Sequence, residues 1–307
     1  RFHSVWDPTM EPTLRVALVL FMSAMRSMGG SSSWCDNLDD GFRMEWEDDF
    51  RTNSLDRNKW SVVCSNDTQP GCEALPFATH VPSNGGECRS ALCVSENVIL
   101  DGEYLTLLSK RVSPDSKIWT TGAVKTVNKA SWSTANGTYR VCISASLPGF
   151  SPEEGKAQGI WPAHWMMPED NSCDPDEGEM DIMEMINGEG ISYSTYHWQD
   201  NWPNVTCAYP KGHQQISANK KLEKNWSEEF HEFAVERAAT HIAFVIDGEV
   251  IINSTATGKD VLLWPKPFYL ILNTAVGGPW PGEPNEQTMS PVEHKIDYVK
   301  VSRKQRG

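Results

Sequence analysis

Short segments with the periodicity of β-strands recur along most of this chain, and glycine, proline and asparagine separate them. Runs of this kind cover residues 44–50, 97–100, 104–108, 121–127 and 137–148. Alternation with a period of two gives each strand one face for a core and one for solvent. Asp101 and Gly102 predict a hairpin turn between the second and third runs. After residue 30 no heptad pattern, internal repeat or long apolar span appears, and residues 219–225 are interpreted as a surface loop or one helical turn. We therefore expect an all-β sandwich.

The first 30 residues differ from the rest of the chain. Residues 14–25 form a short apolar run with Arg15 near its start, followed by a stretch rich in serine and glycine. The run is short for a membrane span and is typical of a signal-peptide core, although a signal anchor is the alternative. We interpret residues 1–30 as an upstream segment plus a signal peptide, with the native chain starting at Met10. This predicts a secreted, extracellular protein with no membrane association after signal removal.

Eight cysteines, an even number, predict disulfide bonds in a secreted chain. They are Cys35, Cys64, Cys72, Cys88, Cys93, Cys142, Cys173 and Cys207. Their order does not decide the pairing, and the absence of C-x-x-C spacing with paired histidines argues against zinc. Five N-x-S/T sequons predict a glycoprotein. The sequon asparagines are Asn66, Asn136, Asn204, Asn225 and Asn253.

The charge balance excludes some classes of partner. With 41 acidic against 27 basic residues, the formal net charge is −14. A chain this acidic is not expected to bind nucleic acid or an anionic membrane surface. A neutral polysaccharide is compatible with the charge, and so is acidity that only keeps the protein in solution.

An acidic stretch, residues 178–186, sets three carboxylates among apolar residues. In a strand, Glu179 and Asp181 point to the same face. Strict alternation would turn Glu184 to the opposite face. One extra residue in a β-bulge at 182–183 restores the phase, and such bulges recur beside active sites. We therefore expect all three acids on one face.

Two of these acids have the spacing of a catalytic pair. Across a bulge, the carboxyl groups of Glu179 and Glu184 would lie roughly 5–5.5 Å apart, the separation in retaining glycosidases. Like charges this close raise one pKa, and that group becomes the proton donor. Asp181 would hydrogen-bond the nucleophile. The alternatives are an amphipathic strand with a solvated acidic face, or a helix.

Residues 179–184 resemble the E-x-D-x-x-E signature of glycoside hydrolase family 16, in the bulged form of laminarinase-type β-1,3-glucanases. Residues 159–168 resemble the family's G-x-W-P-A-F-W-x-x-P, with His164, expected to fill space, in place of phenylalanine. Residues 268–282 resemble the laminarinase segment Y-L-I-L-N-x-A-V-G-G-x-W-P-G. The resemblance extends over nearly all of the chain after the signal region.

This resemblance implies a β-jelly-roll, a sandwich of two antiparallel sheets with a concave substrate cleft. It assigns residues 35–303 to the catalytic domain and residues 304–307 to a tail. It also implies that Glu179 is the nucleophile, Glu184 the acid/base and Asp181 an assisting residue.

The resemblance further suggests which residues bind substrate. Trp161 and Trp165 would share one strand face and stack on sugar rings, with core filling as the alternative. His197 would hydrogen-bond the acid/base side or a leaving-group sugar, unless it is a structural histidine. Asn273 would hydrogen-bond the substrate, and Trp280 would stack on it.

The implied reaction is retaining endo-hydrolysis of a β-1,3-glucan by a monomer, with no metal or organic cofactor. Family members often carry a structural calcium ion, and Asp49 and Asp297 are the matching positions. Three alternatives remain: a β-glucan recognition protein, a transglycosylase, and a hydrolase of mixed-linkage glucan, agar or carrageenan. Recognition proteins lack the catalytic carboxylates that this chain has. The loop at residues 277–280 favours β-1,3-glucan, and the lack of a basic cluster near the motif argues against sulfated galactans.

Overall fold

The computed structural model describes residues 33–37, 40–65, 86–149, 155–170, 175–199, 209–221, 226–255, 263 and 265–305. The chain divides into two units, residues 1–33 and Trp34–Gly307, and the account below concerns the second. The predicted signal segment lies outside the described residues. So do Cys72, Cys173 and Cys207 and the sequon asparagines Asn66, Asn204 and Asn225.

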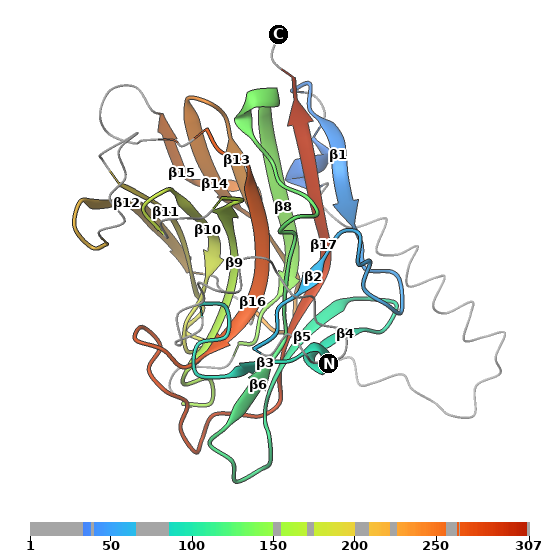
Figure 1. The fold of residues 1–307 in the computed structure, drawn as a ribbon, viewed down its shortest axis with the longest axis vertical. Coiled ribbons are helices and arrows are strands. Elements are labelled where there is room, and N and C mark those ends of the chain that lie inside the picture. The colour runs from blue at the N-terminus through green and yellow to red at the C-terminus, as the bar shows by residue number, and fades with distance from the viewer. Residues whose placement is uncertain are drawn as a thin grey trace, which may run out of the picture. The chain divides into compact units, whose positions relative to one another are not determined.

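Two β-sheets make up the described part of the second unit (Figure 1). The ten-strand sheet has the order β15 (Glu249–Thr255), β14 (His241–Ile246), β13 (His231–Arg237), β8 (Thr138–Ser146), β17 (Val292–Lys304), β5 (Leu105–Arg111), β6 (Trp119–Thr121) and β3 (Leu92–Cys93). In addition, β1 (Arg43–Asp48) pairs with β17, and β4 (Val98–Leu100) pairs with β5.

The seven-strand sheet carries the acidic motif near its centre. Its order is β12 (His213–Lys221), β11 (Ile191–Gln199), β10 (Glu179–Glu184), β9 (Ile160–Pro168), β16 (Phe268–Val276), β7 (Ala123–Lys125) and β2 (Ser61–Val62). The helices of the described residues are single 3-10 turns, η1 (Trp34–Asp36), η3 (Ser95–Asn97) and η4 (Thr134–Asn136). Accordingly, none of the described helices has the length and apolarity to span a bilayer.

The strand pairs are antiparallel, apart from the short parallel pair of β3 and β6. Side chains from both sheets form one buried hydrophobic cluster, which includes Leu107 and Phe233 from the ten-strand sheet and Met180 and Leu272 from the seven-strand sheet. Burial of the apolar face of each sheet against the other is the main stabilising contribution in such a sandwich. The predicted all-β jelly-roll is confirmed.

Two segments differ from the sequence-based expectation. Residues 121–127 were expected to form one strand, but the chain breaks at Gly122 and enters different sheets as β6 and β7. A Cβ at Gly122 would lie 2.3 Å from the backbone oxygen of Asn97, so only glycine fits at this crossing. The interpretation of residues 219–225 as a loop or helical turn is wrong for residues 219–221, which end strand β12.

Disulfide bonds are present, as predicted. One joins Cys35 in η1 to Cys142 in β8, and another joins Cys88 to Cys93 just before η3. Cys64 is also disulfide-bonded. No cysteine among the described residues is free.

Candidate active site

The register of strand β10 shows how its acids reach one face. Against β11, Asp181 pairs with Thr195 and Glu184 pairs with Tyr193, so two residues of β10 lie opposite the single Ser194. This is the predicted bulge, and the register against β9 shifts at the same place. Ser194 stabilises it by donating its hydroxyl to the carbonyl of Ile182 at 2.7 Å. We call the face that bears the three acids the acid face.

Apolar residues hold the other face of β10 in place. Met180, Ile182 and Met183 are all fully buried in the main hydrophobic cluster. Turning the strand over would bury carboxylates and expose these side chains, which is strongly unfavourable. The positions of the acids are therefore set by the apolar residues between them.

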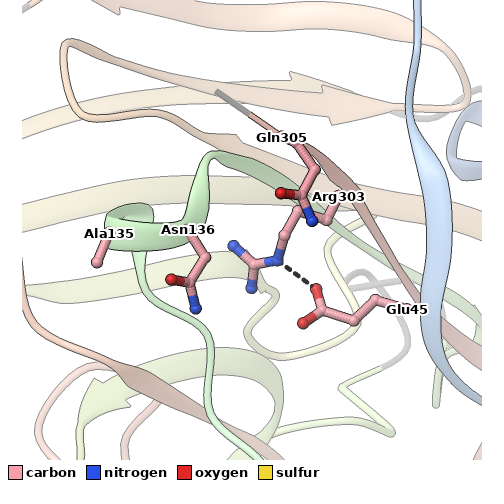
Figure 2. A pocket seen from close by; sticks show the side chains of 5 residues that line it. All are labelled: Glu45, Ala135, Asn136, Arg303 and Gln305. Atoms are coloured by element: carbon pink, nitrogen blue, oxygen red, sulfur yellow. Dashed lines mark hydrogen bonds and ion pairs between the residues drawn. The ribbon is translucent and has the colours of Figure 1, made fainter. Parts of the chain in front are cut away.

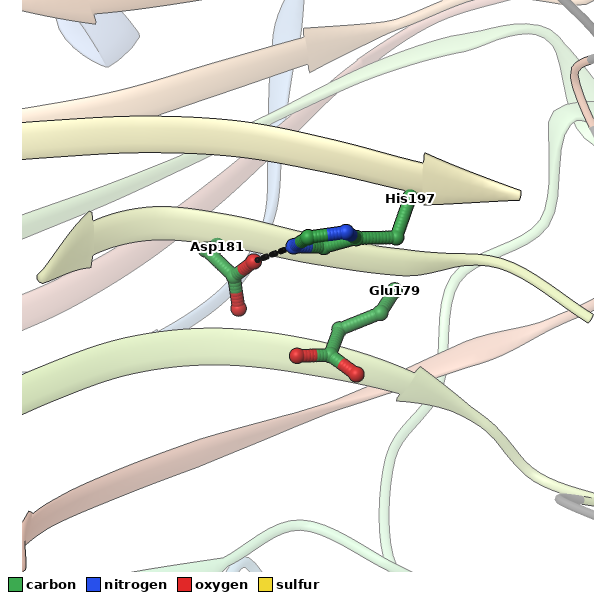
Figure 3. Close-up of side chains that lie close together, drawn as sticks. All are labelled: Glu179, Asp181 and His197. Carbon is green, nitrogen blue, oxygen red and sulfur yellow. Dashed lines mark ion pairs between the residues drawn. The ribbon is translucent and has the colours of Figure 1, made fainter. Parts of the chain in front are cut away.

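Glu179, Asp181 and His197 lie together on the acid face (Figure 3). His197 Nε2 lies 3.0 Å from Asp181 Oδ2, and the Asp181 side chain is almost completely buried. On the other side of the ring, His197 Nδ1 lies 3.1 Å from His213 Nε2, and the two rings stack with centroids 5.0 Å apart. These two contacts fix the orientation of the His197 ring. Burial and the neighbouring His197 lower the pKa of His213.

His197 lies across from Glu179 on the neighbouring strand. It pairs in register with Glu179, and its imidazole contacts Asp181. The carboxylate that His197 contacts is thus Asp181, and the expected hydrogen bond to the acid/base side or to a leaving-group sugar stays a prediction. The His197 ring belongs to the end of the site that holds the predicted nucleophile.

Glu184 has different surroundings. The Trp161 indole donates a hydrogen bond from Nε1 to Glu184 Oε1 at 3.0 Å. Burial and the Asp181 carboxylate raise the pKa of Glu184 well above its usual value, while the Trp161 hydrogen bond and the Arg89 charge act in the opposite direction. A carboxyl group in this state keeps its proton at higher pH than an exposed glutamate does.

Aromatic rings extend the acid face beyond Glu184. The Trp280 ring meets Trp161 edge-on, with centroids 5.5 Å apart, and meets Tyr193 at 5.1 Å. Trp280 is 42% exposed, which is unusual for tryptophan and leaves an apolar surface open to a ligand. Trp161 and Trp165 are both half-buried on the same face of β9, as expected.

Asn273 and Trp165 are bonded to each other. Trp165 Nε1 donates to Asn273 Oδ1 at 2.8 Å, and Asn273 Nδ2 donates to the carbonyl of Glu87 at 2.6 Å. Asn273 is only 2% exposed. Its amide therefore orients Trp165 and the segment at Glu87. Both the Oδ1 and the Nδ2 of Asn273, which was expected to hydrogen-bond the substrate, are engaged in these bonds.

Sequence reasoning missed three residues at this site: Arg89, Tyr193 and His213. Arg89 lies between two cysteines that form a disulfide, and its guanidinium lies 5.0 Å from the centre of the Trp161 ring. Tyr193 could have been suggested by its place in the sequence, because it lies on β11, the strand that follows and pairs with the acidic strand β10. His213 lies in β12, where polar residues gave no strand signal.

The predicted calcium position does not fit this ion. Asp297 forms an ion pair with the Arg51 guanidinium, and Asp49 accepts a hydrogen bond from the Arg51 backbone N–H. Calcium needs six to eight oxygen ligands, and here a positive charge lies beside one of the two expected carboxylates. Among the described residues, the group close enough to hold a metal ion is Glu179, Asp181 and His197, whose ligand atoms lie within 4.8 Å of one another.

A separate surface hollow lies on the ten-strand sheet (Figure 2). It is lined by Glu45, Ala135, Asn136, Arg303 and Gln305. Arg303 Nε pairs with Glu45 Oε2 at 2.6 Å, so the two charges neutralise each other. The hollow includes none of the acids of β10.

Comparison with known proteins links this geometry to a family. Residues 113–300 match the model of glycosyl hydrolases family 16. A β-glucanase of Rhodothermus marinus is 28% identical over 222 residues, covering 68% of this chain and 71% of the relative. A keratan-sulfate endo-1,4-β-galactosidase of Sphingobacterium multivorum is 27% identical over 270 residues, covering 85% of this chain. The chain spans 55% of the length of that second relative.

Solved structures show the same architecture. The laminarinase catalytic domain of Thermotoga maritima superposes with a TM-score of 0.67 at 26% sequence identity. The match covers 86% of this chain and 99% of that domain.

Proposed function

Because this chain belongs to family 16 of the glycosyl hydrolases, we propose that it cleaves internal β-1,3 linkages of a laminarin-type β-glucan with retention of configuration. The observation that carries the proposal is the contrast between the surroundings of two carboxyl groups. Glu179 lies beside Asp181 and His197, whereas Glu184 accepts a hydrogen bond from Trp161 and has a raised pKa. Retaining glycosidases use such a pair as nucleophile and acid/base.

The reaction would proceed in two steps. In the first, the Glu179 carboxylate attacks the anomeric carbon, and Glu184 gives its proton to the departing glycosidic oxygen. In the second, Glu184 takes a proton from water, which attacks the same carbon and releases Glu179. Asp181, held by His197, would hydrogen-bond the nucleophile. Both steps use side chains and water, with no cofactor.

The aromatic surface supports a neutral sugar polymer as substrate. Trp161, Trp280 and Tyr193 present ring faces and edges beside Glu184, and such rings stack on the apolar faces of pyranoses. The match to a laminarinase domain favours β-1,3-glucan. The match to a galactosidase keeps other β-linked polymers as alternatives, which an assay must separate.

Digestion of a panel of polysaccharides tests the proposal. Laminarin, mixed-linkage glucan, agarose, carrageenan and keratan sulfate would each be incubated with the wild-type enzyme and with Glu179→Gln. We expect oligosaccharides from laminarin first, and none from the variant although it remains folded. Products longer than an oligosaccharide substrate would indicate transglycosylation. Tight laminarin binding without turnover would refute hydrolysis and favour a recognition protein.

We also propose that the protein is secreted, glycosylated and monomeric, with residues 35–303 as its catalytic domain. The disulfides Cys35–Cys142 and Cys88–Cys93, together with the bonded Cys64, support an oxidising compartment. Asn136 and Asn253 are exposed, as glycan attachment requires. A mass decrease on enzymatic deglycosylation of protein from the culture medium would support this, and its absence would contradict glycosylation. Light scattering of the same sample would give the oligomeric state.

A further inference from the structure

We propose that Arg89, presented by the Cys88–Cys93 disulfide loop, is a positioning residue for the reaction, which holds Trp161 against Glu184 and donates hydrogen bonds to the sugar bound there. This inference rests on the proposed function. It assigns a role to a residue that lies outside the acidic motif in sequence and inside the site in space.

The backbone around Arg89 is fixed against the site. Arg89 has a φ of 53°, in the left-handed region, and forms a parallel bridge with Val276 at the end of β16. Ser90 N donates to the Val276 carbonyl at 2.9 Å, and the disulfide joins Cys88 to Cys93, five residues apart in sequence. A left-handed arginine is unusual and requires such surrounding restraints. The loop therefore holds Arg89 in one place.

The Arg89 side chain lies over the residue that contacts Glu184. Its guanidinium carbon is 5.0 Å from the Trp161 ring centre, within the range of cation–π attraction. A Cβ at Gly278 would lie 3.5 Å from both Arg89 Cγ and Trp161 Cζ3, so both side chains lie against this glycine. Trp161 in turn donates to Glu184. One continuous set of contacts thus joins the loop to the predicted acid/base.

The Arg89 guanidinium keeps capacity to bind a ligand. Its Nε is buried, and none of the described residues provides it with an acceptor. Arginine presents five N–H donors in a planar fork, and sugar hydroxyls are suitable acceptors. Because the buried Nε is out of reach of a ligand, a sugar bound beside Trp161 would accept from the terminal NH2 groups of the fork, which is how this residue would orient the substrate.

The same charge acts on Glu184. Burial and the Asp181 carboxylate raise the pKa of Glu184, whereas Trp161 and Arg89 lower it. Tyr193, its neighbour on β11, is hydrogen-bonded to Glu189. Loss of the Arg89 charge would raise the pKa of Glu184 further. Because the first step needs protonated Glu184, the basic limb of the activity profile would move to higher pH.

Kinetics of Arg89→Gln and Arg89→Lys on laminarin test this inference, with Arg111→Gln as control. The Arg111 guanidinium carbon likewise lies 4.8 Å from the centre of a tryptophan ring, that of Trp119. Trp119, however, is buried and lies on the ten-strand sheet, away from the acid face. We expect Arg89→Gln to lower kcat/KM about tenfold or more and to move the basic limb upward. Arg89→Lys should restore the position of the limb and only part of the rate. Arg111→Gln should change thermal stability alone.

The result is distinguishable from failure of the proposed function. An inert wild-type enzyme would refute the function, while an active wild type with Arg89→Gln within twofold of it would refute the inference. A readout without turnover is the pKa of Glu184, measured by carboxyl NMR with Glu184→Gln for assignment. We expect a higher pKa in Arg89→Gln than in wild type. Equal values, or an equal change in Arg111→Gln, would overturn the role of Arg89.

Discussion

Trp161 Nε1 donates a hydrogen bond to Glu184 Oε1 across 3.0 Å, from strand β9 to the last residue of strand β10. The two residues come from different motifs in the sequence, and the bulge in β10 brings them together. The bond stabilises the charged form of Glu184, whereas burial stabilises the neutral form. The balance between these effects determines the pH at which Glu184 holds its proton.

Trp161→Phe should lower kcat/KM on laminarin about tenfold, since a hydrogen bond to a charged group contributes roughly 1.5–3 kcal/mol. Removal of the donor raises the pKa of Glu184, so the basic limb of the pH profile should move to higher pH. Trp165→Phe is the matched control, because its indole N–H donates to Asn273 instead. A limb that moves equally in both variants would contradict a specific Trp161–Glu184 contact.

His197→Gln should reduce kcat roughly 10- to 100-fold, the size typical for a residue that orients a functional side chain through a hydrogen bond. The physical reason is the loss of the contact that holds Asp181 beside Glu179. KM should change little, because the ring acts on the reacting groups. His241→Gln is the control, since His241 pairs with Glu236 on the other sheet at 2.7 Å. Steady-state kinetics on laminarin measures kcat for both variants. If His197→Gln keeps full kcat, as His241→Gln should, the role given to His197 is contradicted.

Trp280→Ala should raise KM about threefold to tenfold, in line with the roughly 0.5–1.5 kcal/mol of an aromatic stacking contact. Turnover should fall less, because an exposed ring binds ground state and transition state alike. Met289 has almost the same exposure, 41% against 42%, so Met289→Ala controls for loss of exposed apolar surface. An unchanged KM in Trp280→Ala would assign Trp280 a structural role.

Acid should destabilise the protein through two buried histidines. His164 and His294 stack between the sheets with Nε2 atoms 3.0 Å apart. Burial lowers the pKa of His164 well below 6.5 and that of His294 to about 3. Below pH 6.5 the unfolded chain binds protons that the folded protein does not, so the free energy of unfolding falls as pH decreases. Each histidine contributes ~1.4 kcal/mol per pH unit to this slope.

Urea unfolding of wild type and His164→Phe at pH 7.5, 6, 5 and 4 measures this effect. The variant loses one titrating group, so its stability should decline less steeply between pH 6 and pH 4. At pH 7.5 it should be less stable by about 1–3 kcal/mol, because His294 loses its buried partner. Parallel pH dependence in the two proteins would show that His164 does not titrate on unfolding.

Local pattern was sufficient to predict most of the fold. Strands such as β8 and β16 carry apolar residues with clear strand character, and the bulge before Glu184 followed from the need to place three acids on one face. Strand β12 was missed because its exposed edge position leaves its residues mostly polar. The break at Gly122 depends on contact with Asn97, a tertiary constraint that local sequence does not contain.

The candidate site was predictable where residues are close in sequence. The β9 tryptophans share one face, as alternation requires, and the predicted bulge in β10 brings Glu184 to the face of Glu179 and Asp181. Arg89 and His213 could not be placed, because a disulfide loop and an edge strand bring them there from distant segments. The partners of Asn273 likewise come from β9 and from Glu87, so its buried bonding state was not visible in the sequence.

Azide rescue of the two glutamate variants tests most directly that Glu179 is the nucleophile and Glu184 the acid/base. With an aryl β-laminaribioside and sodium azide, Glu184→Ala should give the β-glycosyl azide, because azide attacks the glycosyl-enzyme. Glu179→Ala should give the α-glycosyl azide, because azide then replaces the missing nucleophile. NMR of the products distinguishes the two anomers. An α product from Glu184→Ala, or a β product from Glu179→Ala, would contradict the account.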